Sequence, residues 1–134
     1  MTTKKTAAAQ ASEDTTRATK AIWRRHRDAW DKRDLEALVS DYSPTAILFL
    51  NHQTYVGQPQ IRKAFQRLFE IFDQGEEHID TPTIKDRIAY ITWHFSPGGR
   101  PAVFGSDTFV VENHAISYQT TASPLYEEYP VPAP

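Results

Sequence analysis

The sequence contains no cysteine, which excludes disulfide bonds, thiolate catalysis and cysteine-ligated zinc sites. It has no apolar run near the roughly 18 residues that a membrane span requires, and no signal-type segment opens it. The sequence contains 15 Lys and Arg against 17 Asp and Glu, for a formal net charge of −2, and no cluster of basic residues stands out. We therefore expect a cytoplasmic protein with no membrane or nucleic-acid partner.

Metal and nucleotide motifs are also absent. No two of the five histidines are three or four residues apart, so the sequence predicts no metal site. Nothing resembles a phosphate loop or a dinucleotide fingerprint, and we expect no cofactor. What remains is a chain of 134 residues, 40% of them hydrophobic, which is typical of one domain with a buried core.

The two ends of the chain differ from its middle. Residues 1–14 are small and polar without an apolar period, and they are predicted to form a disordered arm before a domain over 15–122. Residues 123–134 contain four prolines, which argues against helix or central strand. Leu125, Tyr126 and Tyr129 give this tail side chains to bury. It either packs on its own domain or a neighbour, or forms a flap over a cavity mouth.

Three helices are predicted in the first half of the domain. Apolar residues recur at three- and four-residue steps over 15–33, and His26 falls on that apolar face. Asp34 is a suitable N-cap for a second, short helix that buries positions up to Tyr42, and Pro44 ends it. A third helix is predicted over 58–73.

Strands are predicted around and after the third helix. A hairpin over 46–50 and 54–56 precedes it, and segments with a two-residue period follow at 77–85, 87–95, 102–112 and 115–121. Helices followed by a run of strands favour the α+β class, with the helices packed on one face of a curved sheet.

The turn at Gly98 and Gly99 predicts the pairing of the two long strands around it. A two-residue turn places His94 opposite Val103 and Tyr90 opposite Asp107. A one-residue bulge would exchange the faces of Trp93 and His94. Without a bulge, one face carries Ile88, Tyr90, Thr92, His94, Val103, Gly105, Asp107 and Phe109, and the other carries Ile91, Trp93, Phe95, Phe104 and Val110. Because both faces are apolar, we expect the second to be covered in a homodimer.

Three stretches carry a family resemblance: DLEALVSDYSPTAILFL, TYVGQPQIRKAFQRLF and FGSDTFVVENHAISYQT. Over residues 15–121 the chain resembles the SnoaL-like branch of the nuclear-transport-factor-2-like superfamily. The resemblance implies a cone-shaped fold with a strongly curved, mixed and mostly antiparallel sheet. The superfamily includes polyketide cyclases, ketosteroid isomerases, epoxide hydrolases, dehydratases and non-catalytic binding modules, so the fold alone does not select a function.

The resemblance also implies a catalytic pair. Asp107 falls where ketosteroid isomerases carry a protonated acid that donates to an oxyanion, and His26 falls where they have a tyrosine on the first helix. Their general-base aspartate is replaced by Leu50, or by Leu48 if the alignment shifts, so the usual isomerase mechanism is not expected. Any proton transfer would then depend on His26 and Asp107. In the alternative interpretations, the two are buried structural groups that satisfy one another, or they do not meet at all.

Two functions follow. The first is a cofactor-independent enzyme (isomerase, cyclase, dehydratase or epoxide-opening type) acting on a small apolar molecule. The second is a non-catalytic binding or dimeric assembly module, and an open volume of about 300 Å³ or more would favour the enzyme. Asp41 is either a cavity acid or, as favoured, exposed; His94 lies at the cavity rim or faces outward. The other predicted lining residues are Trp30, Tyr42, Leu48, Leu50, Tyr55, Phe65, Phe69, Tyr90, Phe109 and Tyr118.

Overall fold

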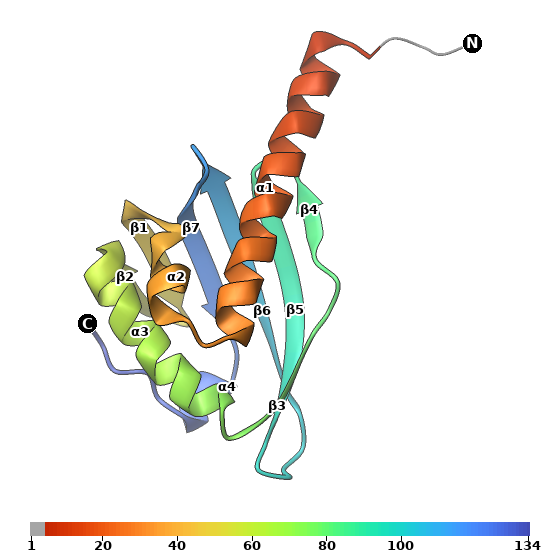
Figure 1. Cartoon of the computed structure of the whole chain (residues 1–134). Coiled ribbons are helices and arrows are strands. Elements are labelled where there is room, and N and C mark those ends of the chain that lie inside the picture. The colour runs from red at the N-terminus through yellow and green to blue at the C-terminus, as the bar shows by residue number, and fades with distance from the viewer. Residues whose placement is uncertain (1–4) are drawn as a thin grey trace.

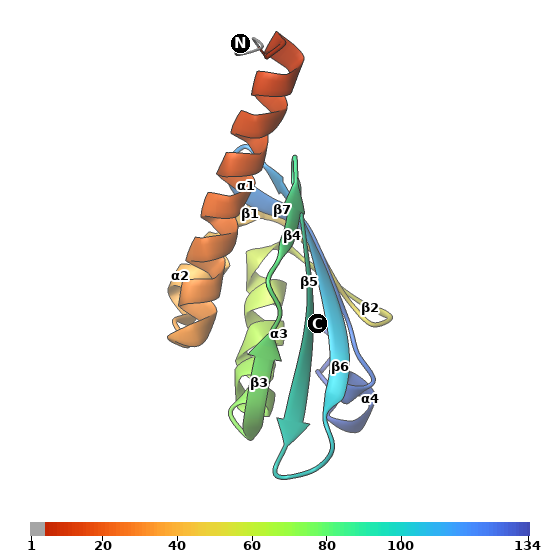
Figure 2. The same cartoon turned by 90° about the vertical axis from the view of Figure 1, so that its right-hand side faces the viewer.

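The computed structural model describes residues 5–134 and places three helices on one face of a strongly curved, seven-stranded sheet (Figures 1 and 2). The strand order is β2-β1-β7-β6-β5-β3, with β4 also paired to β5; β1 and β7 are parallel and the other pairs are antiparallel. This arrangement confirms the α+β class. The elements are α1 (Ala7–Asp31), α2 (Leu35–Ser40), β1 (Tyr42–Leu50), β2 (Gln53–Val56), α3 (Gly57–Phe72), β3 (Gly75–Ile79), β4 (Thr83–Lys85), β5 (Ile88–Pro97), β6 (Val103–Glu112), β7 (Ala115–Ala122) and α4 (Leu125–Glu128).

Helix α1 starts at Ala7, eight residues earlier than predicted, so an arm over 1–14 is wrong for residues 7–14. The Thr6 hydroxyl accepts from the Ala9 N–H at 3.0 Å and caps the helix, and the alanines that follow favour helix strongly. These first turns extend past the end of the sheet (Figure 1). Thr16 ties the helix to the β4–β5 turn, since its hydroxyl accepts from the Asp86 N–H at 2.9 Å. Residues 1–4 of the predicted arm lie outside the described residues.

Two strands differ from their predicted limits. Tyr42 begins β1 instead of ending α2, and the β1–β7 register shifts between Tyr42 and Ile47, which accommodates Pro44 in a strand. The single strand predicted over 77–85 is divided into β3 and β4. Pro82 lies in the gap and cannot donate to a strand ladder.

The register of β5 against β6 is one residue away from the predicted pairing. Trp93 lies opposite Gly105 and Ile91 lies opposite Asp107, because three residues, 98–100, form the turn instead of two. Gly98 and Gly99 both have positive φ, at 46° and 77°, and the Arg100 N–H donates to the Pro97 carbonyl at 2.8 Å. The extra residue reverses which side chains of β5 face the helices.

The two faces of β5 are therefore exchanged relative to the prediction. Ile91, Trp93 and Phe95 are buried in the core, so they do not belong to the second apolar face predicted for a homodimer. The sheet face away from α1–α3, here called the outer face, instead carries all the large hydrophobic side chains that are exposed within residues 5–134. They are Phe49, Val56, Ile88, Tyr90, Phe104 and Tyr118.

The proline-rich tail packs on its own domain. It contains the one-turn helix α4, contrary to the prediction of no helix, and its Leu125 and Val131 side chains are buried. The Tyr55 hydroxyl donates to the Pro132 carbonyl at 2.5 Å and fixes the end of the tail. None of the helices within residues 5–134 combines the length and apolarity needed to cross a membrane.

Candidate functional site

A pocket with a cavity volume of about 40 Å³ lies between the helices and the sheet face that is turned toward α1–α3, here called the inner face. This volume holds a few water molecules, given that one water needs about 10–15 Å³. Five residues predicted for the site line it: His26, Trp30, Phe65, Asp107 and Phe109.

Asp107 reaches the pocket from β6. The indole N–H of Trp93 donates to its Oδ1 at 3.0 Å, and Gln119 Nε2 donates to its Oδ2 at 3.2 Å. The Tyr42 hydroxyl in turn donates to the Gln119 carbonyl oxygen, which fixes that amide. Burial raises the pKa of Asp107 above its usual value, opposed by these hydrogen bonds, one with Thr121 and the charge of His26. The carboxyl group is thereby shifted toward the neutral form that can donate a hydrogen bond.

His26 reaches the pocket from α1 and is enclosed by aromatic rings, with centroids 5.2 Å away for Phe109 and 5.6 Å for Tyr42. Its nearest carboxylate is Asp41, whose Oδ2 lies 3.8 Å from His26 Nδ1. The interpretation of His26 and Asp107 as a mutually satisfied pair is therefore wrong. Asp41 has no exposed side-chain surface, so its favoured exposed position is wrong as well.

Glu77 is a site residue that the sequence analysis missed. It reaches the pocket from β3, is half-buried, and accepts from the indole N–H of Trp30 at 2.7 Å. Burial raises the pKa of Glu77 to about 7, while the Trp30 hydrogen bond and the positive charge of Arg33 oppose the increase. Glu77 can therefore both accept and release a proton near neutral pH.

Eight predicted lining residues lie elsewhere. Tyr42, Leu48, Leu50 and Tyr55 are buried in the core without lining the pocket, and half-buried Phe69 packs against Trp30 with ring centroids 5.5 Å apart. Three more, Tyr90, His94 and Tyr118, are on the outer face, with Tyr90 and Tyr118 over 40% exposed. The one-residue register difference explains Tyr90 and His94, since both alternate with the inward residues of β5.

Other pocket residues were missed for identifiable reasons. Trp93 was assigned to the opposite face by the same register difference. Tyr126 enters from the tail, which was predicted either to pack on a domain or to form a flap over a cavity mouth, without Tyr126 being named as a lining residue. Glu77 could have been found, because it is in phase with Ile79 on a strand of period two. Within residues 5–134 no three His, Cys, Asp or Glu side chains gather closely enough to hold a metal ion.

Comparison with known proteins agrees with this architecture. The model of the SnoaL-like domain family matches residues 23–119, whereas no curated protein matches. A candidate ketosteroid isomerase from Kribbella flavida is 15% identical, with 81% of this chain and 79% of that chain covered and a TM-score of 0.67. An NTF2-like protein of unknown function from Mesorhizobium loti is 14% identical, with 81% and 92% covered and a TM-score of 0.72.

A third similar structure is a candidate polyketide cyclase from Xanthomonas campestris. It is 14% identical, 87% of this chain and 98% of that chain are covered, and the TM-score is 0.65. At these identities the likeness extends to the fold, so a function must be argued from the pocket itself.

Proposed function

This chain belongs to the SnoaL-like domain family, and from that premise we propose that its pocket binds a small, largely apolar molecule and moves protons on it without a cofactor. One observation carries the proposal: three titratable side chains from three different elements, His26, Glu77 and Asp107, meet in one aromatic-walled pocket. Such convergence is typical of sites that carry out acid–base chemistry.

The environments of the three groups support distinct roles. Asp107, whose pKa is raised by burial, donates a hydrogen bond in its neutral form to a ligand oxygen as negative charge develops there. His26, beside the Asp41 carboxylate, is the base that accepts the proton. Glu77 is half-buried and so exchanges protons between the pocket and solvent. The substrate class is a small carbonyl, hydroxyl or epoxide compound with an apolar body.

The second candidate is a non-catalytic binding or assembly module of the same fold. A volume of about 40 Å³ favours it, because this is far below the size of an ordinary ligand site, about 300 Å³ or more. Under the first proposal, a ligand must therefore displace a wall residue. Tyr126 is the wall residue contributed by the tail, and its hydroxyl lies 3.1 Å from Thr121 Oγ1.

The test is proton exchange on a compact ketone. Cyclopentanone is incubated with the protein in D₂O, and loss of its α-proton signal is followed by NMR, so that proton transfer is detected whatever the natural product is. We expect exchange above the buffer rate, reduced by about 10²-fold or more in Asp107→Asn and His26→Phe with little loss of stability. His78→Phe and Asp80→Asn change the same residue types at exposed positions and serve as matched controls.

The same variants distinguish the module from the enzyme. If both are structural, each lowers the free energy of unfolding by about 1–3 kcal/mol, because a buried polar group loses its partner. Absence of exchange in the wild type together with such losses would overturn the enzyme proposal and support the module. Thermal melts measure the second effect directly.

A further inference from the structure

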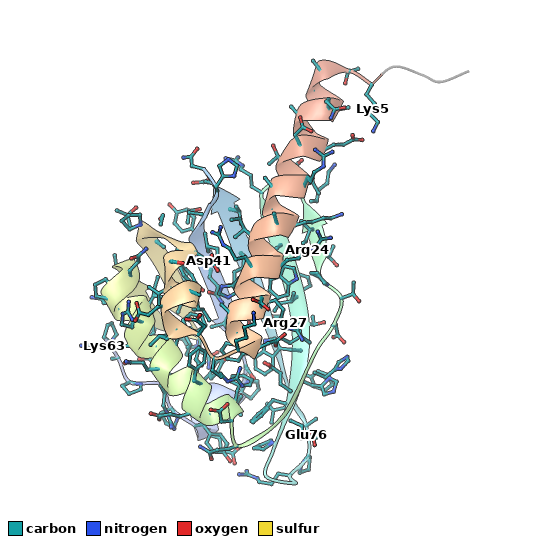
Figure 3. The ribbon with its side chains drawn as sticks, viewed as in Figure 1. Lys5, Arg24, Arg27, Asp41, Lys63 and Glu76 are labelled. Atoms are coloured by element: carbon teal, nitrogen blue, oxygen red, sulfur yellow. The ribbon has the colours of Figure 1, made fainter. Side chains whose placement is uncertain are left out.

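Asp41 lies at the junction of α2 and β1, beside α1 (Figure 3). Its backbone N–H donates to the Leu38 carbonyl at 3.2 Å as α2 ends, and its carbonyl accepts from the Ile116 N–H at 2.7 Å. The side chain has no exposed surface. The backbone of Asp41 is therefore anchored on both sides, by α2 and by β7.

Two buried polar atoms face each other here without a hydrogen bond. Asp41 Oδ2 and His26 Nδ1 are the only fully buried, unpartnered side-chain nitrogen and oxygen atoms found within residues 5–134, and they are 3.8 Å apart. Leaving two such atoms unsatisfied is unfavourable unless they interact with each other. A movement of under about 1 Å would bring them to hydrogen-bond distance.

The other carboxylate oxygen of Asp41 is paired with a positively charged side chain. Asp41 Oδ1 accepts from Arg25 Nε at 2.5 Å, and the Arg25 side chain is 60% exposed. Since Arg25 and His26 are consecutive on α1, one helix turn presents a cation to one carboxylate oxygen and an imidazole to the other. The buried Oδ2 is thereby left free to accept a hydrogen bond from the atom that faces it, His26 Nδ1.

We infer that Asp41 is a positioning residue that keeps the His26 proton on Nδ1, so that the unprotonated Nε2 is the basic atom available to a pocket ligand. The inference rests on the proposed function for the use of that base, whereas the ring orientation stands independently of it. Because Nδ1 is fully enclosed while His26 lines the pocket, the ring meets the pocket through its opposite edge. When Nε2 accepts a proton, the Asp41 carboxylate stabilises the imidazolium.

The direct test reads the protonation of each ring nitrogen. Long-range ¹H–¹⁵N NMR of the ¹⁵N-histidine-labelled full chain is recorded at neutral pH without ligand, and His26 is assigned from the signals lost in His26→Phe. We expect a protonated Nδ1 and an unprotonated Nε2 in the wild type. A wild-type His26 with its proton on Nε2 would overturn the inference.

A variant series separates positioning from charge. In Asp41→Asn the carboxamide can donate to Nδ1, so we expect the Nε2–H form to rise above half. Arg25→Gln removes the exposed partner of the same carboxylate, and there we expect the wild-type pattern. An unchanged His26 pattern in folded Asp41→Asn would also overturn the inference.

Where cyclopentanone exchange is measurable, Asp41→Asn should slow it about 10-fold or more at saturating ketone, with half-saturation within twofold of wild type. If the NMR pattern is as expected but no exchange occurs, the proposed function fails while the positioning role of Asp41 stands.

Discussion

The indole N–H of Trp93 donates to Asp107 across the paired strands β5 and β6, at 3.0 Å. Trp93 lies opposite Gly105, two residues before Asp107, and a Cβ placed on Gly105 would lie only 2.0 Å from the Trp93 ring. The missing side chain of Gly105 therefore provides the space in which the indole crosses β6 and reaches the carboxylate.

Gly105→Ala should displace the Trp93 ring and break its hydrogen bond to Asp107. We expect the free energy of unfolding to fall by about 1–3 kcal/mol, the usual cost of overpacking a core, and the Trp93 indole N–H resonance to shift. Urea unfolding and ¹H–¹⁵N NMR measure the two effects. Ser106→Ala, at the next residue and on the outer face, should change stability by less than about 0.5 kcal/mol. Equal stability and an unmoved indole signal in Gly105→Ala would contradict the prediction.

Glu77 should give the protein a pH-dependent stability term. Its pKa is about 7 in the folded chain and 4.5 in the unfolded chain, so the folded state binds the proton more tightly. The stabilisation that this proton gives is fully present below pH 4.5 and is lost as the pH rises to about 7. Above that pH, Glu77 adds no further pH dependence. We expect Glu77→Gln to remove about 1–2 kcal/mol of this pH dependence, less than full burial would give because solvent reaches the carboxyl group.

The measurement is urea unfolding at pH 4.5 and pH 8 for the wild type and Glu77→Gln, which keeps an acceptor for the Trp30 N–H. Glu76→Gln is the matched control, because Glu76 is exposed and is the preceding residue at the end of the sheet (Figure 3). Wild-type and Glu77→Gln stabilities that differ by the same amount at both pH values would disprove the assignment.

A homodimer through the outer face remains a prediction, now with a different set of residues. Among residues 5–134, Phe104 is the most exposed large hydrophobic side chain, at 71%, and Phe49 and Tyr118 are on the same face. A stable dimer buries about 800 Å² per partner, and a cluster of this kind is suited to it. Sedimentation at micromolar concentration should give twice 15.3 kDa for the wild type and for Lys63→Ser, on α3, and 15.3 kDa for Phe104→Ser. A wild-type monomer would refute it.

The tail should behave as part of the folded domain. Leu125 is fully buried, and its carbonyl oxygen accepts a hydrogen bond from the Tyr129 N–H at 2.8 Å. We therefore expect slow amide exchange at Tyr129. Leu125→Ala should cost about 2–4 kcal/mol of stability, the range for a large-to-small core change, whereas exposed Glu127→Ala should cost little. Exchange at Tyr129 as fast as at residues 5–8 would show that the tail is not anchored.

Much of the fold was predictable because periodicity is a local property. The three- and four-residue steps around His26 place it on the buried face of α1 whatever the rest of the chain does. Asp107 is two residues from Phe109 on a strand, so the two side chains share a face. The order of helices and strands, and hence the α+β class, follows from the same local patterns. The helix start at Ala7 was missed because the N-cap at Thr6 leads into alanines, which favour helix without giving an apolar period.

The partners of the site residues were decided by the tertiary structure. One additional turn residue between β5 and β6 brought Trp93, not His94, to the inner face, and the sequence pattern fits either turn length. Glu77 is contacted by Trp30, 47 residues earlier, and buried Asp41 is near His26 only because α2 folds back against α1. Residue type and spacing determined which groups could do chemistry; their protonation and orientation depend on burial and on contacts between distant segments, which form only in the folded chain.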